Sequence, residues 1–299
     1  MSVEIQQVAE DTYSLDCGKD PIFEVRQIAY LVMDEAAALI DPGSTSSVSQ
    51  YVEACAQHGI DIEKLKYIVP THIHVDHGGG SGYLAERLPG SRVVLHPRGA
   101  VHMKSPERLT EGVRAVFGQD FDQVLGPILP VPEKRMLVAD DGETIRLGRR
   151  QLTIYYAPGH APHHIAIHDS LTDGLFCGDA LGYISDEIPG LPVPVGTPPF
   201  DLEAYVQTID RLAALEPSVV FYGHHGARTD AGVLMKQVRD IVIAFGDMIQ
   251  ESLAAGDDDE RIAERVLEYL RQYHHEARLP LIVQASIPGY VGFYRDQMT

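Results

Sequence analysis

The sequence predicts a mixed α/β fold, a four-layer αββα sandwich that is followed by a C-terminal helical extension. The order of elements repeats within residues 1–230, because each half has paired strands, an aspartate at a strand end, a helix, and a strand that ends in histidine. The strand ends also match: Leu39–Gly43 corresponds to Phe176–Ala180, and Val69–His72 to Phe221–His224. Two such halves can bury their apolar faces against each other, which leaves the polar strand ends along one edge.

Composition limits the class of protein and its partners. The 299 residues, 44% hydrophobic and 22% charged, are typical of a globular protein with a sizeable core. A formal net charge of −19 argues against nucleic acid or an anionic membrane as the main partner, and we expect a small-molecule substrate instead. The start has no signal-peptide pattern, no apolar run reaches the ~18 residues of a membrane span, and three scattered cysteines indicate a reducing compartment. We therefore expect a cytoplasmic protein.

In the first half of the chain, the sequence predicts strands that lead to a histidine-rich turn. Apolar runs bounded by turn residues predict strands within 3–15, 28–33, 36–40, 65–70 and 92–96. A helix is expected over 44–58, with Gly59 at its end. Residues 97–127 form a mostly helical insertion, broken by Pro106 and Gly118. This insertion is interpreted either as a lid over a pocket or as helical packing outside the sheet, and both interpretations stay open.

The second half repeats the pattern and ends in helices. Strands are predicted at 135–138, 143–147, 151–156, 164–168, 174–177 and 218–222. An amphipathic helix spans 201–215, and the proline-rich stretch 184–200 is expected to be a loop that contributes a pocket wall. Amphipathic helices at 233–254 and 261–273 belong to a C-terminal extension, 231–299, that packs on the same domain or on a second subunit. A homodimer is therefore one prediction.

The turn at 71–80 contains three histidines and an aspartate within six positions. His72 and His74 alternate in an extended segment, so their side chains share a face. Asp76 and His77 follow directly, and Gly78–Gly80 allow a sharp turn close to a site. Imidazole and carboxylate donors at this spacing predict a metal site rather than a polar turn that is rich in histidine by chance.

This His-x-His-x-Asp-His turn after a strand resembles the metallo-β-lactamase superfamily, as do three later donors in order and approximate spacing. Those donors are His160 in Ala-Pro-Gly-His, Asp179 in Cys-Gly-Asp, and His224 in Gly-His. The resemblance covers roughly residues 10–230 and implies the same four-layer fold. It implies one metal ion at His72, His74 and His160, a second ion at Asp76, His77 and His224, and Asp179 as a bridge between them. Asp41 resembles the carboxylate that, in this family, hydrogen-bonds a ligand histidine.

The ligand types support this assignment independently. Five neutral imidazoles and two carboxylates suit borderline divalent ions, Zn²⁺ first, with iron or manganese as alternatives. Two ions ~3.5–4 Å apart can share a water and lower its pKa toward ~7. The hydroxide would then attack a carbonyl carbon, and Asp76 would act as the catalytic residue that orients it.

Several neighbours of these residues have open interpretations. His225 is an alternative ligand to His224, although the Gly-His spacing favours His224. His163 and His164 lie close to His160 in sequence, so one of them could orient a ligand while the other is exposed. Tyr183 is either a donor to a substrate oxyanion or a packing residue. Cys177 is interpreted as a small core residue rather than a reactive thiol.

The leading functional prediction is a metal-dependent hydrolase that cleaves a small ester-like bond in a thioester or lactone. No cysteine occupies a ligand position, so the set resembles the glyoxalase II and lactonase branches more than several true β-lactamase classes. The alternative is an iron-dependent oxidoreductase of the same fold that acts on dioxygen or a persulfide. A metal-stabilised binding module is a third hypothesis. A nuclease is disfavoured because no basic stripe is present.

Overall fold

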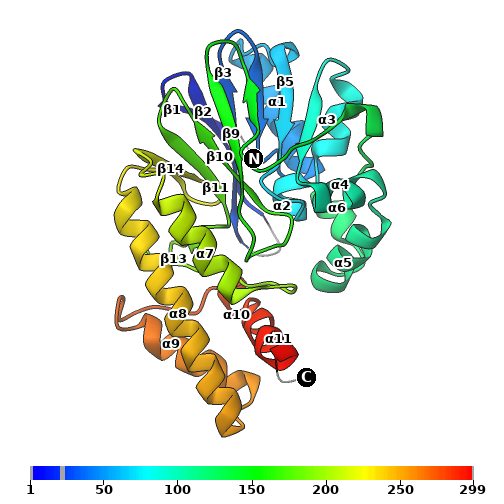
Figure 1. The fold of residues 1–299 in the computed structure, drawn as a ribbon. Coiled ribbons are helices and arrows are strands. Elements are labelled where there is room, and N and C mark those ends of the chain that lie inside the picture. The colour runs from blue at the N-terminus through cyan, green and yellow to red at the C-terminus, as the bar shows by residue number, and fades with distance from the viewer. Residues whose placement is uncertain (1–2, 21–23, 298–299) are drawn as a thin grey trace.

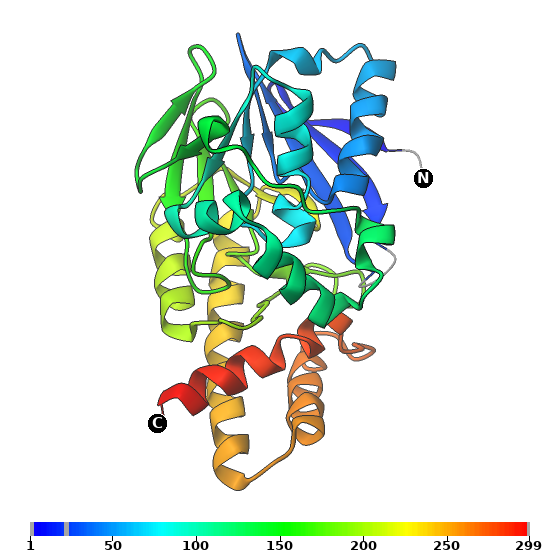
Figure 2. The same cartoon turned by 90° about the vertical axis from the view of Figure 1, so that its right-hand side faces the viewer.

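The computed structural model describes residues 3–20 and 24–297. Two β-sheets pack face to face, and helices cover both outer faces (Figure 1). The predicted four-layer αββα sandwich is therefore confirmed. Further helices extend from the sandwich at the C-terminal end of the chain (Figure 2). None of the helices in the described ranges combines the length and the apolar character that a membrane crossing requires.

The first sheet has seven strands in chain order, β1 to β7. Its strands are β1 (Glu4–Ala9), β2 (Thr12–Lys19), β3 (Arg26–Met33), β4 (Ala37–Ile40), β5 (Leu65–Val69), β6 (Arg92–Leu95) and β7 (Met136–Val138). The strands β1 to β4 are antiparallel neighbours, whereas β4 to β7 are parallel. Parallel pairing requires crossover connections, and helices supply them here. The carboxyl ends of β4 and β5 consequently lie side by side.

The second sheet has the order β15-β14-β11-β10-β9-β8. Its strands are β8 (Thr144–Arg146), β9 (Gln151–Tyr156), β10 (Ile165–Asp169), β11 (Gly174–Gly178), β14 (Val219–Tyr222) and β15 (Gly226–Arg228). Because β10 is antiparallel to both β9 and β11, and β14 is parallel to β11, the strands β9, β11 and β14 all end at one edge.

Side-chain alternation along the strands separates the layers. On β3, Tyr30 and Val32 enter the core between the sheets, whereas Leu31 faces the helices of the first outer layer. Ile40 and Leu39 on β4 divide in the same way. Alternate residues of a strand point to opposite faces, so a strand that is apolar throughout, such as β3, is expected when both faces are covered.

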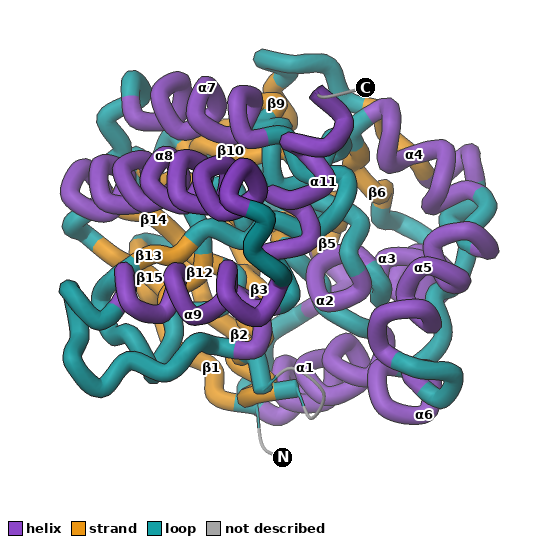
Figure 3. The backbone as a smooth tube through the Cα atoms, turned by 90° about the horizontal axis from the view of Figure 1, so that it is seen from below, coloured by secondary structure: helices purple, strands orange, loops and turns teal. Residues whose placement is uncertain are grey.

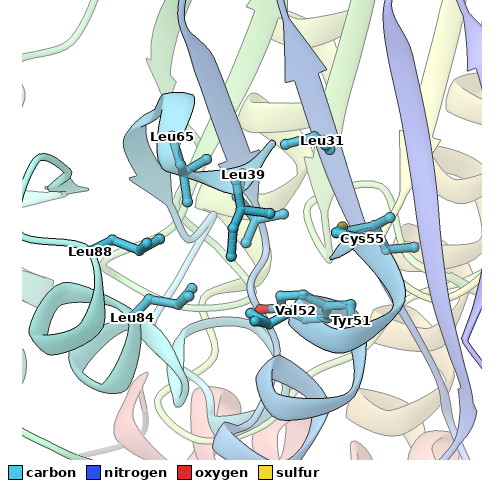
Figure 4. Close-up of a pocket in the computed structure, with 10 residues that line it drawn as sticks. Leu31, Leu39, Tyr51, Val52, Cys55, Leu65, Leu84 and Leu88 are labelled. Carbon is cyan, nitrogen blue, oxygen red and sulfur yellow. The ribbon is translucent and has the colours of Figure 1, made fainter. Parts of the chain in front are cut away.

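The first outer layer consists mainly of α1 (Thr45–Gln57) and α3 (Ser81–Arg87). Leucines of the sheet and of α3, together with Tyr51 and Cys55 of α1, surround a void of about 10 Å³ (Figure 4). The Tyr51 hydroxyl donates a hydrogen bond of 2.5 Å to the Pro42 carbonyl. Pro42 follows Asp41 directly, so this buried bond ties α1 to the turn after β4.

Replacing Tyr51 with phenylalanine is expected to lower the free energy of unfolding by about 1–2 kcal/mol, because the buried Pro42 carbonyl loses its donor. Chemical denaturation measures the change. Tyr83→Phe is the matched control, since within the described ranges its hydroxyl has just one hydrogen bond, a long and exposed one of 3.4 Å from Ser49. Equal destabilisation of both variants would contradict the importance of the Tyr51 bond.

The insertion between β6 and β7 is helical, as predicted. It consists of α4 (Pro97–Lys104), α5 (Glu107–Phe117) and α6 (Phe121–Leu125), and a 3₁₀ turn, Glu133–Arg135, precedes β7. Val113, Phe121 and Leu125 form a small apolar cluster with Val75 of α2 (Val75–Gly78). The insertion therefore packs beside the histidine-rich turn rather than far along the sheet. Another 3₁₀ turn, Ile62–Lys64, leads into β5.

The second outer layer and the C-terminal extension share one large apolar cluster. Its helices are α7 (Leu202–Ala213), α8 (Ala231–Ala255), α9 (Asp259–Leu270), α10 (Leu281–Gln284) and α11 (Ile287–Gln297). Leu234 and Val238 of α8 join Leu175 and Val220 of the second sheet in this cluster. Figure 3 shows α7 and α8 side by side, whereas Figure 1 places α9 beside the far part of α8, beyond the ends of the strands. The extension is thus continuous with the sandwich core.

Two short features differ from the sequence-based expectation. The proline-rich stretch 184–200 contains part of a two-stranded pair, β12 (Tyr183–Ile184) with β13 (Pro192–Val193). The strand β15 adds an edge to the second sheet after His225. Elements of two or three residues are too short to show the alternation on which a sequence prediction depends.

Candidate metal centre

Seven potential ligand side chains meet at the edge where the strands of both sheets end. They follow β5, β9, β11 and β14: His72, His74, Asp76, His77, His160, Asp179 and His224. Asp76 and His77 lie on the short helix α2, and the other five lie in loops directly after strands. The sequence-predicted set is therefore brought together in space, although its members span more than 150 positions.

The first group consists of His72, His74 and His160. The Nε2 atom of His72 lies 2.9 Å from Nδ1 of His74, and Nε2 of His160 lies 3.0 Å from the same Nδ1 atom. All three donor atoms are within 4.8 Å of one another. His72 and His160 are fully buried, so these nitrogens face each other rather than water.

The second group consists of Asp76, His77 and His224. The Nε2 atoms of the two histidines are 3.0 Å apart. An oxygen of Asp76 lies 3.6 Å from His77 Nε2 and 3.5 Å from His224 Nε2. The side chain of Asp76 is 28% exposed, whereas both imidazoles are almost completely buried. Asp76 is therefore the member of this group that solvent or a substrate reaches most easily.

Asp179 lies between the two groups, with one oxygen toward each. Its Oδ2 atom is 3.4 Å from His160 Nε2 and 3.9 Å from His72 Nε2. Its Oδ1 atom is 3.5 Å from His77 Nε2 and 3.4 Å from His224 Nε2. This buried oxygen has no hydrogen-bond partner within the described part of the chain. One oxygen of this carboxylate therefore faces each group.

The hydrogen bonds on the far side of the rings show that the centre fits cations. The Nδ1 atoms of His160 and His224 lie 2.9 Å and 2.7 Å from the carbonyl oxygens of Val195 and Arg26. A neutral imidazole has a single N–H, and a carbonyl can only accept. The Nε2 atom of each neutral ring therefore presents a lone pair to the centre. Converging lone pairs and a buried carboxylate suit divalent ions such as Zn²⁺.

Thr71 orients His72 in the same way. Its hydroxyl and its backbone N–H both donate to Asp41 Oδ1, at 2.8 Å and 2.7 Å. The hydroxyl oxygen then accepts from Nδ1 of His72, 3.1 Å away, which leaves Nε2 as a lone pair. The other Asp41 oxygen lies 3.0 Å from His77 Nδ1. The structure therefore places Asp41 behind two of the histidines, as the family resemblance implies for this carboxylate.

The backbone around Asp179 is fixed by three further residues. His164 Nε2 accepts a hydrogen bond of 3.1 Å from the Asp179 N–H, and its ring stacks on His72 with 4.7 Å between centroids. The Tyr205 hydroxyl of α7 donates to the Asp179 carbonyl at 2.7 Å. Gly178 has φ +47°, and a Cβ there would lie 2.3 Å from the Thr71 hydroxyl. Only glycine combines this conformation with such a close approach.

The pKa shifts of the histidines differ between the first group and His77. Burial lowers the pKa of His72, His74 and His160, so these rings are neutral and ready to bind an ion. Burial also lowers the pKa of His77, but the charges of Asp41, Asp179 and Asp76 outweigh it and raise this pKa to about 10. The second group is therefore a site of excess negative charge, and His77 carries a proton there at neutral pH.

Metal binding is accordingly expected to release protons at pH 7. His77, with its pKa near 10, has to lose its proton before it can bind a metal, so the apparent affinity should rise by up to about tenfold per pH unit below that pKa. Calorimetric titration of Zn²⁺ into chelator-stripped protein, in two buffers of different ionisation enthalpy, measures the proton count. A count of zero at pH 7 would contradict this assignment of charge.

Three residues with open interpretations lie outside the two groups. Tyr183 packs its ring 5.8 Å from His224 and joins an apolar cluster with Val25 and Val195. It is not among the described residues that line the pocket, so the geometry favours packing over oxyanion binding. His225 is half-buried and contacts Arg228 instead of the centre. His163 is half-buried, lines the pocket, and lies 5.8 Å from the His74 ring.

A pocket of about 640 Å³ opens onto the centre, and His74, Asp76, His160 and Asp179 are among the residues that line it. Val195, Thr197 and Pro198 contribute one wall, which confirms that the proline-rich stretch borders a pocket. The other walls come from the helical insertion and from α10 and the start of α11, and sequence reasoning did not assign residues there. Whether the insertion moves as a lid stays a prediction.

Comparison with known families agrees with this geometry. The model of the metallo-beta-lactamase superfamily matches residues 25–224, which is two thirds of the chain. The chain belongs to the metallo-β-lactamase superfamily. Members of this family are mostly hydrolases that bind divalent metal ions. The matched segment begins just before β3 and ends at His224, so it contains all seven candidate ligands.

Relatives of this metallo-β-lactamase-fold chain include hydrolases. A metallo-beta-lactamase fold-containing protein of Sulfurisphaera tokodaii is 26% identical over 219 residues, or 72% of this chain and 78% of that protein. A hydroxyacylglutathione hydrolase of Gloeobacter violaceus is 30% identical over 155 residues, or 51% and 48%. An acyl-coenzyme A thioesterase of Homo sapiens is 32% identical over 158 residues, or 49% and 50%. The chain thus matches about half the length of the latter two.

Solved structures share the fold over nearly the whole chain. A metallo-beta-lactamase family protein from Thermus thermophilus has a TM-score of 0.73 and 21% identity, and the match covers 98% of this chain and 95% of that one. A beta-lactamase domain protein from Burkholderia ambifaria has a TM-score of 0.67 and 17% identity, over 98% and 89%. Both matches extend through the C-terminal helices, so the extension is part of the shared fold.

Proposed function

We propose that this chain is a metal-dependent hydrolase that cleaves a small ester-like bond, in a thioester or lactone, with two divalent ions. His72, His74 and His160 would hold one ion, Asp76, His77 and His224 the other, and Asp179 would bridge them. The observation that carries the proposal is the position of Asp179, whose two oxygens lie 3.4 Å from His160 on one side and 3.4 Å from His224 on the other.

The chain's own residues would prepare the site for hydrolysis. Divalent ions, when bound, supply Lewis acidity and lower the pKa of water toward ~7. Asp76, whose side chain is 28% exposed, can accept a hydrogen bond from a water molecule and orient it toward the pocket. Val75, Leu109 and Val113 give the pocket an apolar wall, which excludes bulk water and strengthens electrostatic interactions inside.

Relatives support the choice of bond. One is named a hydroxyacylglutathione hydrolase and another an acyl-coenzyme A thioesterase. The pocket that opens onto the candidate ligands also supports an enzyme over a metal-stabilised binding module, since structural metal sites are closed. The imidazole-rich ligand set favours Zn²⁺, and iron or manganese would suit the same donors.

The test measures metal content and turnover together. Purified full-length protein should contain close to two metal ions per chain and hydrolyse members of a panel of thioesters and lactones. Dipicolinate treatment should remove the activity, and Zn²⁺ should restore it. Metal-replete protein without turnover of any ester, or unchanged turnover after complete chelation, would refute the proposal. One iron per chain with oxygen uptake would instead support the persulfide or dioxygen alternative.

A further inference from the structure

The pocket has a single arginine or lysine side chain, Arg108, among the described residues that line it. Arg108 lies in the first turn of α5, in the helical insertion, and its side chain is exposed. It lines the same cavity as His74, Asp76 and Asp179. An exposed side chain that also borders the cavity lies at its mouth, where an incoming ligand passes.

Arg108 differs from many arginines of this acidic chain because no described residue forms an ion pair or hydrogen bond with it. Arg211 pairs with Asp141 at 2.8 Å and Arg239 with Asp210 at 2.5 Å, and both pairs are on the surface. With a formal net charge of −19, internal carboxylates are abundant, yet none in the described ranges pairs with this guanidinium. Its five N–H donors are therefore free for a ligand that carries oxygen acceptors.

Apolar residues line much of the cavity, together with the polar residues Asp20, Gln27, His102, His163 and Thr197. Leu109 and Val113 come from the same helix as Arg108, one and five positions later. Ile282, Ala285 and Pro288 come from α10 and the start of α11. The C-terminal extension and the insertion therefore both contribute walls to one cavity of about 640 Å³, a size typical of small-molecule sites. These walls suit a short hydrocarbon segment.

We propose that the substrate is an acyl ester or thioester that carries an anionic group, which Arg108 binds at the pocket mouth. The apolar walls hold the hydrocarbon segment between that group and the scissile carbonyl. A guanidinium matches the paired oxygens of a carboxylate or a phosphate, so both anions share the required chemistry. Hydrolysis of this compound rests on the proposed function, whereas its recognition by Arg108 is separable from catalysis.

The binding test uses thioethers, which have no bond for the enzyme to cleave. Three S-hexyl compounds are titrated into metal-loaded protein: S-hexylglutathione with carboxylates, S-hexyl-phosphopantetheine with a phosphate, and neutral S-hexyl-N-acetylcysteamine. Wild type should bind at least one anionic compound about tenfold or more tightly than the neutral one. Arg108→Gln should remove this preference and leave neutral binding within about twofold. The anionic compound whose affinity falls more in Arg108→Gln shows whether Arg108 prefers a carboxylate or a phosphate.

Two further variants separate recognition from a structural role. Arg98→Gln makes the same charge change at an exposed position of the insertion that does not line the cavity, so it should leave all three affinities unchanged. Arg108→Lys should restore part of the preference. Equal loss of neutral and anionic binding in Arg108→Gln, or equal binding of all compounds by wild type, would overturn the proposal, as would the absence of measurable anion binding.

Turnover of the matching hexanoyl thioesters distinguishes this inference from the proposed function. With both correct, Arg108→Gln should raise KM for the anionic thioester about tenfold and leave kcat nearly unchanged, because binding far from the carbonyl affects substrate affinity. Wild type that binds anionic thioethers through Arg108 but hydrolyses no ester would refute only the proposed function. Turnover without any effect of Arg108→Gln on anionic compounds would refute only this inference.

Discussion

Replacing Asp179 with asparagine is expected to lower kcat/KM by more than about 100-fold and to reduce the metal content below two ions per chain. Mutating a residue that only supports a metal ligand typically costs about 10–100-fold, and Asp179 has an oxygen on each side of the centre. Asparagine keeps the shape but removes the charge and replaces one oxygen with an amide nitrogen, which has no lone pair for a cation. Elemental analysis and thioester hydrolysis measure the two effects.

Asp122→Asn is the matched control, because Asp122 is exposed on α6 and its loss of charge is the same. It should retain full metal content and activity.

The charge of Asp179 explains why asparagine is a severe change. Burial alone would raise the pKa of Asp179, but the charges of His77, His224 and His160 outweigh it and hold this pKa well below its usual range. An Asp179→Asn protein that binds two ions and turns over substrate normally would refute the bridging role.

The clustering of the candidate ligands could be predicted from the sequence because most of the pattern is local. Four ligand candidates lie within six positions, and a strand ends just before them, so no distant contact is needed to recognise the turn. His160, Asp179 and His224 are weaker signals taken singly. They become informative only because each follows a predicted strand, and strands of one direction end at one edge. The fold prediction and the site prediction therefore depend on the same observation.

The residues that line the pocket walls could not be predicted from the sequence. Arg108 and Ile282 line one cavity although 174 positions separate them, and neither lies in a pattern that relates it to the other. Their proximity follows from how the insertion and the C-terminal helices pack on the sandwich, which periodicity does not encode. Tyr183 illustrates the converse case. Its spacing from Asp179 allowed an oxyanion donor, but in the structure Tyr183 packs in an apolar cluster behind Val25 and Val195, which line the pocket.

A buried ion pair lies at the edge of the sandwich opposite the centre, since Arg150 precedes β9 and His160 follows it. Arg150 Nε and Nη2 donate to the two oxygens of Asp169 at 2.8 Å and 2.6 Å. Arg150 Nη2 also donates to Thr12 Oγ1 at 2.6 Å, and Nη1 donates to the Met33 carbonyl at 3.2 Å. Asp169 belongs to the second sheet and Thr12 to the first, so one guanidinium links both sheets.

Replacing Arg150 with methionine is expected to lower the free energy of unfolding by about 3–5 kcal/mol, because Asp169 then stays buried without a counter-charge. Denaturation by urea, followed by circular dichroism, measures the change. The double variant Arg150→Met with Asp169→Leu should recover part of the loss, since replacing both partners by apolar groups removes the uncompensated charge.

Arg239→Met provides the control, because the Arg239–Asp210 pair is bidentate but exposed to solvent. Exposed pairs contribute little, so its urea midpoint should match that of wild type. If Arg150→Met unfolded at the same midpoint as Arg239→Met, the buried Arg150–Asp169 pair would contribute no more to stability than an exposed ion pair. If instead the double variant were less stable than Arg150→Met, the remaining hydrogen bonds of Asp169, to the N–H groups of Leu171 and Thr172, would be the stabilising element.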